Sequence, residues 1–178
     1  MTIRENQFLT NARDIEQWLR GHRVTEYMIY SHPIYTNVVE VFADCDLSYQ
    51  DLSSIPVKFY YIQGDFNISY NRLSDLTFSP LLIEKNFFCQ NNLLTSLEEG
   101  PDTVKGSYIC SNNNIENLMH LPSQVNGSFY FMNNPKLLPY THKSFKEIKE
   151  MNQIQKDQRS LSLAVGQPLV NRNMNYKI

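Results

Sequence analysis

Apolar residues recur with a period of 21 through the middle of the chain, and this repeat predicts the fold. Each copy places one apolar residue on each side of a variable position. In most copies an asparagine follows three positions after the second apolar residue. A fixed period of this length is typical of a solenoid, because one repeat cannot bury its apolar face alone and stacks on its neighbours. The inner pairs are Cys45 and Leu47, Phe66 and Ile68, Phe87 and Cys89, Tyr108 and Cys110, and Phe129 and Phe131.

The alternation within each copy predicts one short β-strand per repeat, because successive side chains of a strand point to opposite faces. The inner pairs then form stacked rungs of one core beneath a parallel sheet. The asparagine comes where the chain leaves the sheet, and its buried amide can satisfy backbone groups of that turn. These residues are Asn71, Asn92, Asn113 and Asn134. Gln50 takes this place in the first copy, which predicts a looser first rung.

The second half of each repeat returns apolar residues to the core and then meets a proline at 80, 101 or 122. Proline lacks an amide hydrogen and therefore interrupts regular structure. A last apolar column, Ile62, Ile83, Val104 and Val125, re-enters the core just before the next strand. The predicted fold is an α/β solenoid, in which a parallel β stack has an irregular convex side of turns and extended chain.

Both ends of the array depart from the repeat, as the ends of a solenoid must if the terminal rungs are to be covered. Residues 1–40 predict an N-terminal cap, with a helix at about 10–20 that buries Trp18 and two short strands joined across His32-Pro33. The array of about five repeats then spans residues 41–139. A C-terminal capping helix is expected over 140–158, followed by a tail over 159–178.

Charge and composition narrow the range of partners. The chain has 16 Lys and Arg against 18 Asp and Glu, a net charge of −2, which gives no electrostatic reason to expect nucleic acid or an anionic membrane. No apolar run is long enough to span a bilayer, and the first residues lack the apolar core of a signal peptide. We therefore expect a cytoplasmic protein. The three cysteines all occupy inward positions, which argues against a disulfide framework.

Three stretches resemble a known family: FNISYNRLSDL, FFCQNNLLTSLEEGP and YICSNNNIENLMHLP. They are similar to the short leucine-rich-repeat proteins of tailed bacteriophages, over roughly residues 10–137. The resemblance implies a small non-enzymatic module that binds a host or phage protein in the host cytoplasm, in its sharpest form an inhibitor active in host takeover or anti-defence. One alternative is a structural or assembly component that self-associates as a homo-oligomer, and another is an enzyme without a recognisable motif.

Catalytic, cofactor-binding and metal-binding patterns are not evident in the sequence. Asp44-Cys45-Asp46 is similar to the Cys-x-Asp element of bacterial leucine-rich-repeat ubiquitin ligases, but that element belongs to a helical domain for which this chain is too short. The inward position of Cys45 predicts a buried thiol instead. The four histidines lack the spacing of a metal site, and no phosphate-binding loop appears. We predict no catalytic residue, no cofactor and no metal.

The outward positions of the strands supply the candidate site. A sheet face in contact with water normally carries polar residues, and the first two repeats follow this rule. Later repeats place apolar residues at the same positions, which predicts a protein interface because large exposed apolar patches and aromatic anchors are typical of interfaces. Cover by the C-terminal helix or tail is the alternative, and an incidental patch is the third. The predicted partner-binding residues are Phe88, Ile109, Tyr130 and Met132, bordered by Tyr70, Gln90 and Asn112.

Overall fold

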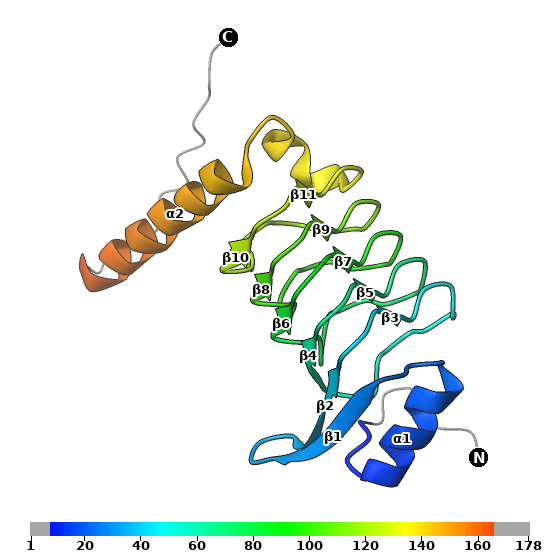
Figure 1. The fold of residues 1–178 in the computed structure, drawn as a ribbon. Coiled ribbons are helices and arrows are strands. Elements are labelled where there is room, and N and C mark those ends of the chain that lie inside the picture. The colour runs from blue at the N-terminus through cyan, green and yellow to red at the C-terminus, as the bar shows by residue number, and fades with distance from the viewer. Residues whose placement is uncertain (1–7, 166–178) are drawn as a thin grey trace. The chain divides into compact units, whose positions relative to one another are not determined.

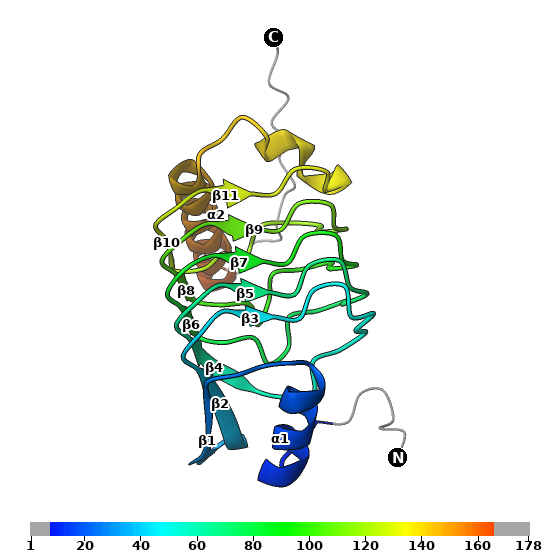
Figure 2. The same ribbon diagram turned by 45° about the vertical axis from the view of Figure 1, so that its right-hand side comes forward.

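The computed structural model describes residues 8–165, with side chains as far as residue 158. The chain divides into two units, Met1–His142 and Lys143–Ile178. The first unit is a β-solenoid of stacked parallel strands, which Figures 1 and 2 show from two sides. The described part of the second unit is mainly one helix.

Successive turns of the solenoid place short strands in two sheets. Neighbouring strands of the repeat array are parallel and keep one register, so that Phe66 lies beside Phe87 and Ile62 beside Ile83. The five-stranded sheet contains, in spatial order, β11 (Phe129–Tyr130), β9 (Tyr108–Ile109), β7 (Phe87–Phe88), β5 (Phe66–Asn67) and β3 (Cys45–Asp46). The six-stranded sheet contains β1 (Tyr27–His32), β2 (Thr36–Val41), β4 (Phe59–Ile62), β6 (Leu82–Ile83), β8 (Thr103–Val104) and β10 (Gln124–Val125).

The six-stranded sheet is the main departure from the sequence prediction. Ile62, Ile83 and Val104 lie in its strands β4, β6 and β8, which form a second sheet that the repeat pattern did not predict. Most of these strands are two residues long, which is too short for an alternation of apolar and polar residues to be recognised in the sequence. They form because the next turn supplies backbone partners at the same height. The stretch between the asparagine and the proline of a repeat, for example residues 71–80, has no helix or strand, as expected. The assignment to the leucine-rich-repeat class stays a prediction.

The predicted inner residues of the first four rungs form the core, with exposed fractions of 1% or less. Aromatic rings follow one another along it: the ring centroids of Phe66 and Phe87 are 5.7 Å apart, and those of Phe87 and Tyr108 are 4.8 Å apart. The last rung is less covered, since Phe131 keeps 7% exposure and Phe129 is half-buried. The predicted register of the repeat is therefore confirmed.

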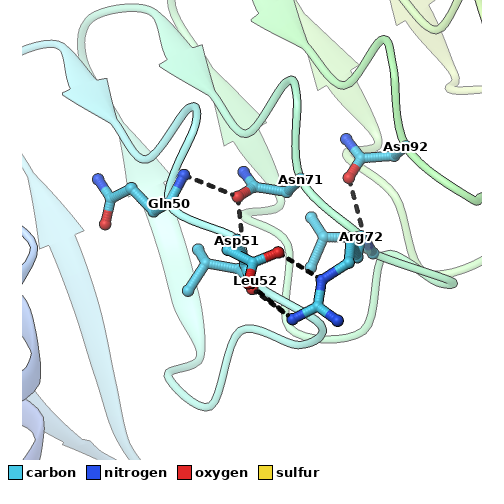
Figure 3. A network of polar contacts seen from close by, with 7 residues as sticks. Gln50, Asp51, Leu52, Asn71, Arg72 and Asn92 are labelled. Atoms are coloured by element: carbon cyan, nitrogen blue, oxygen red, sulfur yellow. Dashed lines mark hydrogen bonds and ion pairs between the residues drawn. The ribbon is translucent and has the colours of Figure 1, made fainter.

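The repeated buried asparagines form a column, the asparagine ladder, which joins each turn to the one before it. The amide nitrogen of Asn92 donates to the carbonyls of Ile68 at 2.9 Å and Cys89 at 3.2 Å, and its oxygen accepts from the Leu73 N–H at 3.0 Å. Asn71, Asn113 and Asn134 repeat this arrangement. Figure 3 shows the Asn71 oxygen accepting from the backbone N–H groups of Gln50 and Leu52. The Gln50 side chain makes one long contact of 3.4 Å to the Asp46 carbonyl, which fits a looser first rung.

A second ladder runs along the corner between the two sheets. Here a side-chain oxygen of one turn accepts the backbone N–H of the residue at the same position in the next turn. Asp44 accepts from Asp65, Asp65 from Asn86 and Asn86 from Ser107, each at 2.8 Å. The Ser107 hydroxyl accepts from Ser128 at 3.1 Å. This ladder satisfies backbone donors at the bend that neither sheet can pair.

The segment before the array contains α1 (Ala12–Gly21) and the hairpin of β1 and β2, and its role as an N-terminal cap stays a prediction. Asn11 caps the start of α1 through its side-chain oxygen. Ile15 and Leu19 are fully buried and Trp18 keeps 8% exposure, as predicted for Trp18. The hairpin is antiparallel, and β2 then pairs in parallel with β4, so the six-stranded sheet continues from the cap into the array.

The predicted C-terminal helix is present, but it begins and ends later than expected. The first unit closes with a 3₁₀ helix, η1 (Pro135–Tyr140), and α2 (Phe145–Val165) follows. Ser144 and Glu147 form a capping box at its start, with the Ser144 N–H donating to the Glu147 carboxylate at 2.7 Å. The first residues of the predicted tail are thus helical, and residues 166–178 lie outside the described part. The role of α2 as a cap of the last rung stays a prediction.

Candidate binding surface

Strand pairing in the five-stranded sheet brings the predicted site residues together. Asn67 pairs with Phe88, Phe88 with Ile109, and Ile109 with Tyr130. Paired strands lie about 4.8 Å apart, so these residues form one continuous column across the sheet. Met132 lies two residues beyond Tyr130, on the same side of the strand by alternation. We call Phe88, Ile109, Tyr130 and Met132 the apolar patch.

Exposure within the apolar patch rises toward the C-terminal end of the array. Tyr130 keeps 50% of its surface and Met132 53%. Phe88 and Ile109 are half-buried, because a strand on each side supplies neighbours to them. The two most exposed residues are therefore an aromatic ring and a flexible thioether, both common at protein interfaces.

The N-terminal part of the same sheet face is polar, and its side chains form hydrogen bonds with residues of the same repeat. The Asp46 carboxylate accepts from the backbone N–H of Ser48 at 2.9 Å and from its hydroxyl at 2.7 Å. The Asn67 oxygen accepts from the N–H of Ser69 at 3.1 Å and from its hydroxyl at 2.6 Å. Phe88, Ile109 and Tyr130 replace these acceptors in the later repeats and have no side-chain atom that could take the same role. The sheet face thus changes from polar to apolar at β7.

A column of residues with left-handed backbone borders the apolar patch, and the sequence analysis did not detect it. Its φ angles are 55° or 56° in all five repeats, at Tyr49, Tyr70, Asn91, Asn112 and Asn133. Asparagine tolerates this region and tyrosine does so less readily. The two tyrosine rings stack with centroids 4.2 Å apart, and the Asn133 amide donates to the Asn112 oxygen at 2.7 Å. The Asn-Asn pairs of the later repeats were the available signal.

The predicted border residues are accessible to different degrees. Tyr70 keeps 45% exposure and Asn112 is exposed, while Gln90 is half-buried. The Gln90 side-chain oxygen is buried without a hydrogen-bond partner among the described residues. A buried acceptor without a donor is unfavourable, so this oxygen costs the fold some stability.

Several charged side chains near the five-stranded sheet form ion pairs with one another. Lys85 contacts Asp44 at 3.1 Å, and Lys105 contacts Glu84 at 2.7 Å. On the other side of the strands, Arg72 contacts Asp51 at 2.5 Å, as Figure 3 shows. The apolar patch itself contains no ionisable group apart from the Tyr130 hydroxyl. Electrostatic attraction therefore contributes little to the recognition of any partner at the patch.

The cysteine thiols are poor candidates for nucleophiles. Burial, with a smaller contribution from the Asp46 charge, raises the pKa of Cys45 to about 12. Burial also raises the pKa of Cys89 and of Cys110 well above the ordinary value. A reactive cysteine needs an exposed and electropositive environment that stabilises its thiolate, and these three lie in the apolar core.

Two hollows of the surface are lined mainly by residues of the turns. One of about 240 Å³ is lined by residues that include Phe8, Pro56 and Phe78, and one of about 300 Å³ by residues that include Asp75 and Glu99. Over residues 8–165, no group of three His, Cys, Asp or Glu residues could hold a metal ion. No helix in this range is long and apolar enough to cross a membrane.

Comparison of the chain with protein-family models, curated proteins and solved structures finds no match. The class of protein is therefore defined by the fold alone, as a β-solenoid with an apolar patch on its five-stranded sheet. The functional argument rests on that patch.

Proposed function

We propose that this protein is a non-enzymatic protein-binding module that binds its partner through the apolar patch. One observation carries the proposal: Phe88, Ile109 and Tyr130 occupy three adjacent strands at the position where Asp46 and Asn67 are polar. Such patches on soluble domains are typical of interaction sites, and aromatic residues contribute most to binding energy there. The repeat pattern supports a module of the leucine-rich-repeat type.

The scaffold favours binding at this place because β7 and β9, which carry Phe88 and Ile109, are paired with a neighbouring strand on both sides. Little conformational entropy is lost when a partner covers Phe88 and Ile109, which their neighbours already hold in position. The exposed part of the apolar patch, at Tyr130 and Met132, carries aromatic and thioether surface. A partner with an apolar side chain at its surface would fit this arrangement.

The resemblance to phage proteins extends the proposal to the biological partner. On that ground the partner is a host or phage protein in the host cytoplasm, and inhibition of a host defence protein is the sharpest form of the hypothesis. This extension rests on the sequence resemblance, whereas the location of the binding surface rests on the apolar patch.

The test is affinity capture from host cells with three versions of the full chain. Phe88→Glu and Tyr130→Glu should each lose the protein that the wild type captures. Gln63→Glu adds the same charge at an exposed position outside the apolar patch and should keep it. With the purified pair, each patch substitution should weaken binding about thirtyfold or more, equivalent to about 2 kcal/mol. Unchanged affinity in both patch variants, with unchanged thermal unfolding, would refute the proposal.

Self-association through the same patch is the second candidate, and the absence of charged side chains from the patch favours it. A structural or assembly component of this kind forms a stable homo-oligomer whose interface includes Tyr130. In that case Tyr130→Glu should reduce the mass in solution to that of a monomer. An oligomer that persists in this variant would exclude the patch as its interface.

A further inference from the structure

Strand β1 presents one unpaired edge at the end of the six-stranded sheet. It is six residues long, and among the described residues it pairs with β2 alone. Figure 1 shows β1 beside β2 at the N-terminal end of the stack. Edge strands expose backbone N–H and C=O groups that can pair with another chain.

The hairpin register determines which groups face outward. The Phe42 N–H donates to the Glu26 carbonyl at 2.7 Å, and Met28 then lies opposite Glu40 in the same set of hydrogen-bonded pairs. Because the direction of the backbone groups alternates along a strand, Tyr27, Ile29 and Ser31 direct their N–H and C=O groups away from β2.

Nothing within β1 protects this edge. Natural edge strands carry charges, prolines or bulges that prevent pairing, and Tyr27–His32 contains no lysine, arginine, acidic residue or proline. Its pairing with β2 is regular over all six residues. Ser31 is exposed, Met28 keeps 58% exposure and Ile29 is half-buried, so apolar surface accompanies the unpaired backbone.

We propose that β1 pairs antiparallel with β1 of a second copy of this chain, about a two-fold axis at Ile29. In this register Tyr27 faces Ser31 of the second copy and Ile29 faces Ile29, which gives about six backbone hydrogen bonds from three hydrogen-bonded pairs. A two-fold interface of this kind is self-complementary, because each contact occurs twice. The two six-stranded sheets become one continuous sheet.

Polar residues at the ends of the strand are compatible with this register. Glu26 lies directly before the strand and His32 at its end, so the Glu26 position of each copy comes opposite the His32 position of the other. The His32 Nδ1 accepts from the Ile34 N–H at 3.2 Å, which leaves Nε2 to donate to a carboxylate. Shifting the register by two residues would separate these two positions in both copies. A carboxylate acceptor and an imidazole donor at facing positions therefore favour this alignment of the two strands.

This interface is separate from the apolar patch, which lies on the five-stranded sheet, and it does not depend on the proposed function. Two copies joined at β1 would present two patches, so a dimer could bind a multivalent partner more tightly than a monomer. The dimer test and the partner-capture test use different variants, so one can fail without the other.

The first experiment measures the dissociation constant of the dimer by sedimentation equilibrium of the full chain. Ser31→Pro should raise it at least about tenfold, because it removes an outward N–H and places a ring between the strands. The hairpin should keep its fold, since the Ser31 N–H faces away from β2. The control Ser31→Ala should dimerise like the wild type. A monomeric wild type at a concentration of about 100 μM, or a dimer unaffected by Ser31→Pro, would overturn the proposal.

The second experiment tests the register. With Ile29→Cys, the two introduced thiols lie on the two-fold axis at a Cα separation of about 5.5 Å, which a disulfide can span. Mild oxidation should therefore give a covalent dimer, while Met28→Cys, which faces Tyr30 of the second copy, should not. The three native cysteines are buried and do not compete. Equal cross-linking of both variants, or none in the Ile29→Cys protein, would exclude this alignment.

Discussion

Asn92 provides the sharpest test of the asparagine ladder, because the hydrogen bonds lost in Asn92→Ala can be followed one by one. The side chain is 6% exposed and takes part in three hydrogen bonds. Two of its partners keep another donor when it is removed: the Ile68 carbonyl also accepts from Asn71, and the Cys89 carbonyl from Asn113. The Leu73 N–H has Asn92 as its acceptor and becomes unsatisfied in a buried place.

The magnitude follows from this difference. An unsatisfied buried N–H costs about 1–3 kcal/mol, and each shared carbonyl bond contributes about 0.5–1.5 kcal/mol. Asn92→Ala should therefore lower the free energy of unfolding by about 3 kcal/mol. Gln50→Ala is the matched control, since Gln50 holds the same position but makes one contact of 3.4 Å. Gln50→Ala should lower the free energy of unfolding by less than about 0.5 kcal/mol.

The assay is urea unfolding, followed by circular dichroism for the sheets and by fluorescence of the single tryptophan, Trp18, for the N-terminal cap. Coincident transitions justify a two-state free energy. If Asn92→Ala and Gln50→Ala destabilise equally, or if Asn92→Ala loses less than about 1 kcal/mol with an unchanged m-value, the ladder does not hold the turns together in the way argued here.

Three further predictions concern the core and the cap. Tyr108→Phe should change the free energy of unfolding by less than about 1 kcal/mol in urea unfolding, because the buried Tyr108 hydroxyl interacts with the Cys89 thiol, which is a weak hydrogen-bonding group; a loss above 1 kcal/mol contradicts this. Burial raises the pKa of Cys45 to about 12 from 9.0, so its contribution to stability is complete below pH 9 and is lost as pH rises toward 12; unfolding midpoints across this range should fall, and less steeply in Cys45→Ala. Deleting residues 1–22 removes Trp18 from the cap and should cause aggregation by light scattering, whereas a soluble, cooperatively folding truncation contradicts the cap assignment.

The inner rungs were predictable because the same chemical type recurs at the same position. Phe66, Phe87 and Tyr108 share the property on which burial depends, and a period of 21 repeats it often enough to be recognised. The corner ladder was not predictable in this way. Its acceptors change from Asp44 to Asn86 to Ser107, so the shared hydrogen-bonding role has no common residue type.

The six-stranded sheet and the left-handed column were missed for related reasons. Strands of two residues, such as Leu82–Ile83, are shorter than any alternation that a sequence can display, and they exist through pairing with the turns above and below. The left-handed positions change from Tyr70 to Asn91 between adjacent repeats, because the stack imposes one φ angle on different residues. Both features are set by contacts between turns, which a single repeat does not encode.

The change of the five-stranded sheet from polar to apolar is not explained by folding. In the first two repeats the outward residue stabilises its own strand end, since Asp46 and Asn67 accept hydrogen bonds from the serine two positions later. The later repeats keep the same backbone and the same inner rungs, yet they give up these bonds for Phe88, Ile109 and Tyr130. A position where local stability is exchanged for exposed apolar surface is typical of a functional site. The scaffold itself would accept an asparagine at the exposed Tyr130 position, so Tyr130→Asn should preserve the fold while removing an anchor of the apolar patch; Phe88→Asn should cost some stability as well, because Phe88 is half-buried.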